Sequence, residues 1–164
     1  WKLKNLVIID LFIIAFGFVL RMVAGGIAIN VAISEWILLC VIFLSFFLGL
    51  GKRREEYITT DFDSTKNTRE VLKQYDRQFL DQMISILAAL AITSYSLYTI
   101  LNQYYRHLFY TILFVIYGIF RYLYILYKKQ GGAKPEKEML NDKHILSSVL
   151  FWIITVFIIL TFYQ

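Results

Sequence analysis

The sequence predicts an all-α membrane protein, a polytopic bundle of transmembrane helices that takes up residues 1–164 as one domain. Hydrophobic residues make up 59% of the chain, well above the roughly 45–50% typical of a soluble domain. Apolar windows recur at about the 20-residue length that crosses a hydrocarbon core about 30 Å thick. Lysine and arginine concentrate in alternate connecting segments, as the positive-inside rule requires of a chain that crosses a membrane repeatedly.

Apolar windows define five spans. They cover about residues 6–30, 36–50, 80–101, 108–127 and 145–163. Basic residues precede the first span and fill the segments 51–79 and 128–144, whereas segment 31–35 has none. We therefore expect a multi-pass protein of the plasma (inner) membrane, with both basic loops in the cytoplasm and lipids around the helices. The net charge of +5 then reflects topology, and no nucleic-acid partner is expected.

Ionisable residues inside the spans point to a polar site. Asp10 and Arg21 lie in the first span and Arg121 in the fourth, where each costs at least a few kcal/mol unless it faces a partner or a polar cavity. Helical spacing places Gly17 and Gly25 on the same face as Asp10 and Arg21. Either these glycines let a neighbouring helix pack closely, or the face lines a hydrated cavity for an anionic substrate. The number of charges favours the cavity.

The basic segment after the second span carries a second candidate site. If the helix persists, Lys52 and Glu56 share a face, and Arg53 points about 100° away from Lys52. Clustered cations suit phosphoryl oxygens, and a carboxylate can hold Mg²⁺ or a ribose hydroxyl. The alternative is a positive-inside anchor with an intrahelical salt bridge. Spacing alone leaves both interpretations open.

An apolar stripe at helical spacing precedes the third span. It comprises Val71, Leu72, Tyr75 and Phe79, with Thr68 as a plausible N-cap. We expect an amphipathic cytoplasmic helix that lies across the mouth of the cavity.

Several sequence blocks together resemble the UbiA-type superfamily of intramembrane prenyltransferases, and within it the decaprenyl-phosphate phosphoribosyltransferases. The blocks are Leu3-Lys4 with Asp10, Phe16 to Arg21 with Ala24-Gly25, Leu50-Gly51-Lys52-Arg53 with Glu56, Val71-Leu72 with Tyr75 and Phe79-Leu80, Phe120-Arg121-Tyr122, and Gly131-Gly132 with Pro135-Glu136, Leu140 and Asp142. Their order and spacing extend over nearly the whole chain.

The resemblance implies that the complete enzyme transfers 5-phosphoribose from phosphoribosyl pyrophosphate to a polyprenyl (decaprenyl-type) phosphate, releases pyrophosphate and uses Mg²⁺, in the synthesis of cell-wall precursors. Lys52 and Arg53 would bind phosphoryl oxygens, and Glu56 would bind the metal or the ribose; these three are the catalytic candidates. Further substrate-binding candidates are Tyr75 as a hydrogen-bonding lid, Arg21 and Arg121 as deeper phosphate partners, and Lys4 and Asp10.

The chain also departs from that family. Family members have nine spans and carry a first aspartate-rich, Mg²⁺-binding motif in the N-terminal half, and nothing like that motif occurs here. The five spans resemble the fifth to ninth, so we expect a fragment that is inactive alone; self-association into a homo-oligomer is left open. Two alternatives remain: a prenyltransferase that uses a prenyl diphosphate, and a non-catalytic scaffold or transport bundle whose basic loop contacts anionic lipids.

Overall fold

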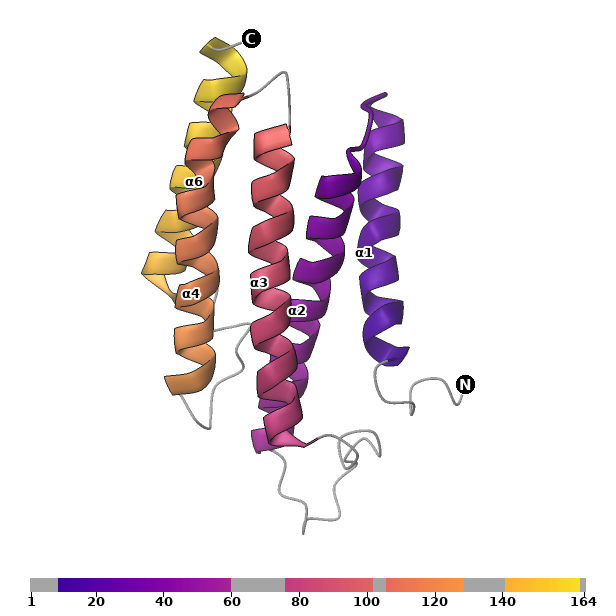
Figure 1. Cartoon of the computed structure of the whole chain (residues 1–164), viewed down its shortest axis with the longest axis vertical. Helices are drawn as coiled ribbons and strands as arrows, with labels where there is room; N and C mark the ends of the chain where they lie inside the picture. Colours follow the sequence, from indigo (N-terminus) through magenta and orange to yellow (C-terminus); the bar gives the residue numbers. More distant parts are fainter. Residues whose placement is uncertain (1–8, 60–75, 102–105, 129–140, 163–164) are drawn as a thin grey trace.

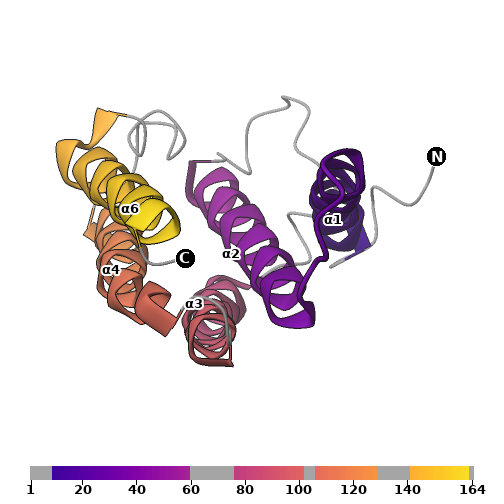
Figure 2. The ribbon, with the colours of Figure 1, turned by 90° about the horizontal axis from the view of Figure 1, so that it is seen from above.

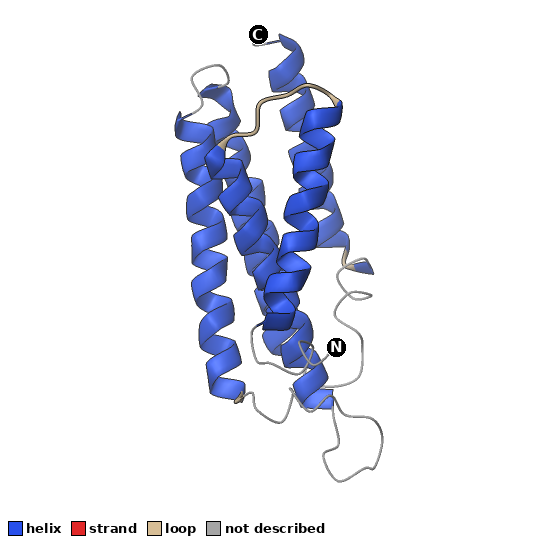
Figure 3. Cartoon of the chain, turned by 90° about the vertical axis from the view of Figure 1, so that its right-hand side faces the viewer, coloured by secondary structure: helices blue, strands red, loops and turns tan. Residues whose placement is uncertain are grey.

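The computed structural model describes residues 9–59, 76–101, 106–128 and 141–162. These residues form α1 (Ile9–Ala28), α2 (Glu35–Thr59), α3 (Arg77–Leu101), the short 3-10 helix η3 (Arg106–Thr111), α4 (Ile112–Lys128) and α6 (Lys143–Phe162), as Figure 1 shows. Within the described ranges there is no strand, and Figure 3 shows the described residues as helices with a few turns. The predicted all-α class is confirmed.

Five helical segments are long and apolar enough to cross a membrane, with η3 and α4 acting together as one segment from His107 to Lys128. This number agrees with the five apolar windows in the sequence. The boundaries differ most at the second span, where α2 continues to Thr59 rather than ending near residue 50. The segment 51–79 therefore begins as helix, and its last residues, from Arg77 onward, already belong to α3. The charged turn of α2 stays helical because its arginines have partners on other helices, described below.

The helices form an open arrangement in which each packs mainly on its neighbours in sequence. Viewed from above in Figure 2, α2 lies near the middle; α1 packs on one side of it, and α3, its most extensive partner, on another. α3 contacts α4, and α4 packs along α6. Successive helices run in opposite directions, so the first turns of α1, α3 and α6 lie at the same end as the last turns of α2 and α4 (Figure 1). We call this the charged end.

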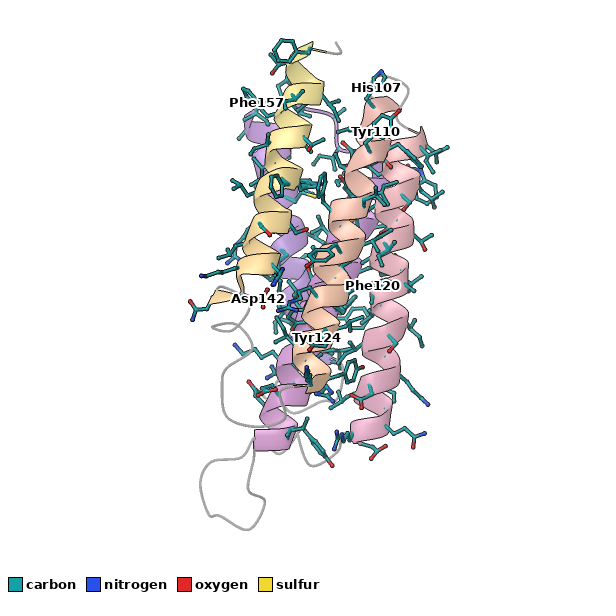
Figure 4. All side chains as sticks on the ribbon, turned by 90° about the vertical axis from the view of Figure 1, so that its left-hand side faces the viewer. His107, Tyr110, Phe120, Tyr124, Asp142 and Phe157 are labelled. Atoms are coloured by element: carbon teal, nitrogen blue, oxygen red, sulfur yellow. The ribbon has the colours of Figure 1, made fainter. Side chains whose placement is uncertain are left out.

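A hydrophobic core joins all five long helices. Its buried members include Leu11, Phe47, Leu80, Ile84, Leu126 and Ile145. Large apolar side chains also cover the outside of the bundle; Figure 4 labels two of them, Phe120 on α4 and Phe157 on α6, which are 59% and 69% exposed. Such a surface suits lipid rather than water, because hydrocarbon imposes no cost on exposed apolar groups.

Gly51 of α2 packs against the Tyr122 side chain of α4. A Cβ atom built on Gly51 would collide with the hydroxyl group of Tyr122, which is itself buried in the core. Gly17 of α1, in contrast, has no neighbouring atom within 4 Å of such a Cβ.

We predict that Gly51→Ala lowers stability by about 1–3 kcal/mol, because the buried Tyr122 ring must move to admit the methyl group. Thermal unfolding in detergent measures the change. Gly17→Ala is the matched control and should leave the melting temperature unchanged or slightly raised. Equal effects of the two substitutions would contradict the packing of Tyr122 against Gly51.

Candidate functional site

The charged end of the bundle is built from arginines paired with carboxylates on different helices. Arg53 and Arg54, consecutive residues of α2, are both buried, and Arg121 of α4 is partly buried. A charge removed from water is tolerated only when partners and hydrogen bonds compensate the lost hydration. Each of these arginines has a carboxylate partner.

Arg53 links α2 to α1. Its Nε donates to Asp10 Oδ2 at 2.7 Å, and its Nη1 donates to Glu56 Oε2 at 2.5 Å. The arginine is 5% exposed, and Asp10 Oδ1 is buried with no hydrogen-bond partner in the part of the chain that the structure describes. A guanidinium between two carboxylates, one of them with a free acceptor atom, forms a cluster that can exchange partners with a charged ligand.

Arg54 links α2 to α3 and α4. It is 1% exposed, and its Nε donates to Asp81 Oδ1 at 2.5 Å. Its Nη1 donates to the carbonyl oxygen of Leu126 at 2.7 Å, and the guanidinium lies 4.5 Å from the centre of the Tyr127 ring. The last four carbonyls of a helix have no partner within it and carry its negative dipole. Arg54 therefore caps α4 and neutralises that end.

Arg121 and Asp142 join α4 to the start of α6. Arg121 Nη2 donates to Asp142 Oδ2 at 2.8 Å, and Arg121 Nε lies 3.2 and 3.3 Å from the two carboxylate oxygens. Asp142 Oδ1 also accepts from the backbone amides of His144 and Ile145 at 3.0 Å, which makes it the N-cap of α6. Hydrogen bonding from Arg121, together with these amides, lowers the pKa of Asp142 to about 2. Figure 4 shows Asp142 and Tyr124 at this end of the bundle.

The structure brings together some of the residues predicted from the sequence. Asp10, Arg53 and Glu56 form one cluster, and Lys52 is exposed beside it. The predicted face shared by Lys52 and Glu56 is present in the helix, and Glu56 also pairs with Arg53. Tyr75 and Lys4 lie outside the described residues, as do the stripe residues 71–72 and the Thr68 N-cap.

Arg21 and Arg121 occupy separate places. Arg21 lies eleven residues after Asp10, about 16 Å further along α1. It is exposed, with its guanidinium 5.5 Å from the centre of the Phe18 ring. Arg121 belongs to the pair with Asp142 on the far side of α2 from α1 (Figure 2). Open space at Gly17 and Gly25 shows that the described residues leave this face of α1 uncovered.

Sequence reasoning missed Arg54 and its partner Asp81. A signal was available in the sequence. Lys52, Arg53 and Arg54 are consecutive, and successive side chains of a helix point about 100° apart, so at least one of the three must face another helix. Asp81 lies inside the predicted third span, which made it a candidate partner for such a cation.

Two apolar cavities adjoin the charged end. One, of about 250 Å³, lies between α2, α4 and α6 and extends from Tyr122 and Ile145 to Phe114 and Trp152. We call it the α2–α4–α6 cavity. The other, of about 180 Å³, lies between α1, α2 and α3, and its lining includes Leu11 and Leu50, neighbours of the Asp10–Arg53 pair. Both cavities are lined mainly by apolar side chains, which suit a bound hydrocarbon chain.

Fold and site together define a multi-span helical membrane protein with paired cations and apolar cavities at one end of its bundle. No family model matches the chain. The chain is 31% identical to the decaprenyl-phosphate phosphoribosyltransferase of Corynebacterium glutamicum over 155 residues, which cover 92% of this chain and 46% of that protein. The enzyme of the same name from Mycolicibacterium smegmatis is 31% identical over 58% of this chain and 30% of its own length. That from Mycobacterium tuberculosis is 25% identical over 94% of this chain and 51% of its own.

These similarities confirm the resemblance predicted from the sequence. The chain is a homologue of the decaprenyl-phosphate phosphoribosyltransferases, and its bundle is consistent with the UbiA-like architecture. It spans about half the length of the curated relatives it matches.

We predict that Arg54→Ala destabilises the bundle by about 3 kcal/mol, because it leaves the Asp81 carboxylate and the end of α4 without their cation. Arg54→Lys should recover only part of the loss, since an ammonium group cannot reach both acceptors with the geometry of the guanidinium. Unfolding in detergent gives the values, with exposed Lys52→Ala as the control. If Arg54→Ala and Lys52→Ala lower the free energy of unfolding equally, the contacts of Arg54 do not stabilise the packing of α2, α3 and α4.

A second prediction concerns pH. Because the pKa of Asp142 in the folded protein is about 2, below the usual 3.8, its ion pair stabilises the fold fully above about pH 4. That contribution should disappear as the pH falls from about 4 toward 2. Asp142→Asn keeps the N-cap but removes the charge, so the variant should lack this part of the acid dependence. Identical acid-unfolding profiles for wild type and Asp142→Asn would show that Arg121 does not hold this carboxylate.

Proposed function

We propose that the complete protein transfers 5-phosphoribose from phosphoribosyl pyrophosphate to a polyprenyl phosphate of the decaprenyl type, with release of pyrophosphate. The names of the relatives support this proposal, and so does the chemistry of the charged end. The observation that carries it is the Asp10–Arg53–Glu56 cluster, a buried guanidinium held by two carboxylates beside the exposed Lys52.

In the proposed reaction, an oxygen of the lipid phosphate forms a bond to the anomeric carbon of the ribose. The bond from that carbon to the pyrophosphate oxygen breaks, and pyrophosphate leaves with the bonding electrons. The lipid phosphate is already an anion, so the step needs no protein nucleophile. The main demand is for cations fixed in place where negative charge grows on the leaving group.

Lys52 and Arg53 would meet that demand. Both lie in the last turns of α2 at the charged end, where Arg53 is held in place by Asp10 and Glu56. We propose that phosphoryl oxygens replace at least one of these carboxylates on Arg53. Glu56 would then turn to a ribose hydroxyl or to the metal, and Asp10 would keep the guanidinium oriented.

The same residues fit a magnesium–pyrophosphate complex. Mg²⁺ is usually held through one or two carboxylates together with substrate phosphates, and Asp10 Oδ1 and Glu56 provide carboxylate oxygens beside Arg53. Among the described residues no group of three metal-ligating side chains occurs. Glu56 would therefore be the main protein ligand in this half, with Mg²⁺ supplying charge neutralisation on the pyrophosphate.

Apolar cavities at the charged end would hold the first part of the lipid tail. Burial of each methylene is worth roughly 0.8 kcal/mol, so even a short enclosed stretch contributes to binding. The proposal places this end of the bundle on the cytoplasmic side of the cell membrane, where the basic segments of the chain attract anionic headgroups.

The test is binding of phosphoribosyl pyrophosphate with Mg²⁺ to the complete protein in detergent. Lys52→Ala and Glu56→Ala should each weaken binding by about tenfold or more, the loss expected for one charge-assisted contact. Lys143→Ala is the control, because Lys143 is an exposed cation at the start of α6, outside the Arg53 cluster.

If the folded wild type fails to bind phosphoribosyl pyrophosphate but binds a prenyl diphosphate, the protein is a prenyltransferase instead. If neither ligand binds and Lys52→Ala only weakens association with anionic vesicles, the basic segment is a lipid contact and the proposed transfer is wrong.

A further inference from the structure

Trp152 of α6 lies at the end of the α2–α4–α6 cavity that is farthest from the charged end. On each of the three helices the lining residues run from a level near the charges to a level deep in the bundle, and Trp152, Phe114 and Leu44 are the deepest. Ile145, at the other end of the α6 lining, is seven residues away, about 10 Å along the helix. The cavity is therefore short, and an indole ring stands at its inner end.

A chain of hydrogen bonds holds this indole. Trp152 Nε1 donates to the Tyr95 hydroxyl oxygen at 2.8 Å. The Tyr95 hydroxyl and Thr111 Oγ1 are 2.7 Å apart, and Thr111 Oγ1 donates to the carbonyl oxygen of Leu108 at 2.5 Å. Since Thr111 uses its proton on Leu108, Tyr95 must donate to Thr111 and is left free to accept from Trp152.

Every donor in this chain has an acceptor, and its two inner members are fixed by packing. Tyr95 is 6% and Thr111 0% exposed. A buried donor without an acceptor is costly, so Trp152 cannot swing away without leaving its own N–H unsatisfied, while Tyr95 would keep its bond to Thr111. The indole is thus a rigid wall rather than a mobile side chain.

The cavity itself suits the tail of an amphiphile whose headgroup lies at the charged end. Its lining is hydrocarbon and aromatic, and at its outer end Tyr122 contacts Gly51, the residue before Lys52. Lys52 follows Gly51 directly, so an anionic phosphate bound through Lys52 would place the attached isoprenoid next to this end of the cavity, whereas Arg53 turns toward Asp10 on α1. A phospholipid acyl chain is the competing occupant.

We infer that Trp152, positioned by Tyr95 and Thr111, sets how many isoprene units nearest the phosphate are enclosed, and so determines the tail specificity of the site. This inference rests on the proposed use of a polyprenyl phosphate. A tail longer than the cavity has to turn out of the bundle at Trp152, so further units add little affinity.

The test measures dissociation constants for a graded series of polyprenyl monophosphates, from geranyl to decaprenyl phosphate, with the complete protein in detergent. In the wild type the affinity should rise with tail length and then level off once the tail fills the cavity. Trp152→Ala should move this plateau to longer tails. The affinity for these longer tails should rise by about tenfold if roughly two further carbon atoms become buried.

Gly118→Ala provides the opposite change. Gly118 lines the same cavity, and a Cβ there would lie 3.8 Å from Ser148 Oγ, an ordinary contact, so the methyl group fits while taking up cavity space. Alanine also favours the helix, so loss of folding cannot explain an effect. We expect weaker binding of tails that fill the cavity. Trp36→Ala, at the start of α2 and outside the lining, should leave the plateau in place.

Failures of this inference and of the proposed function are distinguishable. If the wild type binds and converts polyprenyl phosphates but the plateau is the same in Trp152→Ala and Gly118→Ala, the role of Trp152 is overturned and the transferase proposal stands. If the plateau moves as expected but no phosphoribose is transferred, the tail site stands and the transferase proposal falls. If no polyprenyl phosphate binds, both fall, and the cavity belongs to a structural lipid.

Discussion

The arrangement of the bundle depends on two adjacent arginines that leave α2 in different directions. Arg53 reaches Asp10 on α1, whereas Arg54 reaches Asp81 on α3 and the end of α4. Neither guanidinium can remain charged in an apolar bundle without these acceptors. The start of α1, the start of α3 and the end of α4 must therefore lie near the level of Arg53 and Arg54. The same requirement explains why α2 continues as a helix through a turn that carries five consecutive charged residues, from Lys52 to Glu56.

The fold was largely predictable from the sequence because the length and hydrophobicity of a membrane span are local properties. Five apolar windows gave five helices, and α3 and α4 begin and end within a few residues of the expected positions. The end of α2 was not predictable in this way. A run of charged residues looks like a solvated loop, and the residues that keep it helical, Asp10 and Asp81, are distant in sequence.

The candidate site was predictable in its residue types but not in its pairings. The sequence selected Asp10, Arg53 and Glu56 through depth, charge and resemblance, and the structure brings them into one cluster. The sequence could not show that Arg121 pairs with Asp142, or that Arg21 lies away from both this pair and the Arg53 cluster. These positions depend on which helices are neighbours. The chain from Trp152 to Tyr95 was equally hidden, since an aromatic belt explains most tyrosines and tryptophans of a membrane protein.

The central claim is that Arg53 and Arg54 face different neighbours of α2, which leaves the Arg53 side available for a phosphorylated ligand. Crossed double-mutant cycles on unfolding in detergent test it most directly. We predict coupling of about 1 kcal/mol or more for Arg53 with Asp10 and for Arg54 with Asp81, and near-additive effects for the exchanged pairs Arg53 with Asp81 and Arg54 with Asp10. Equal coupling in all four cycles, or coupling only in the exchanged pairs, would contradict this arrangement of α2.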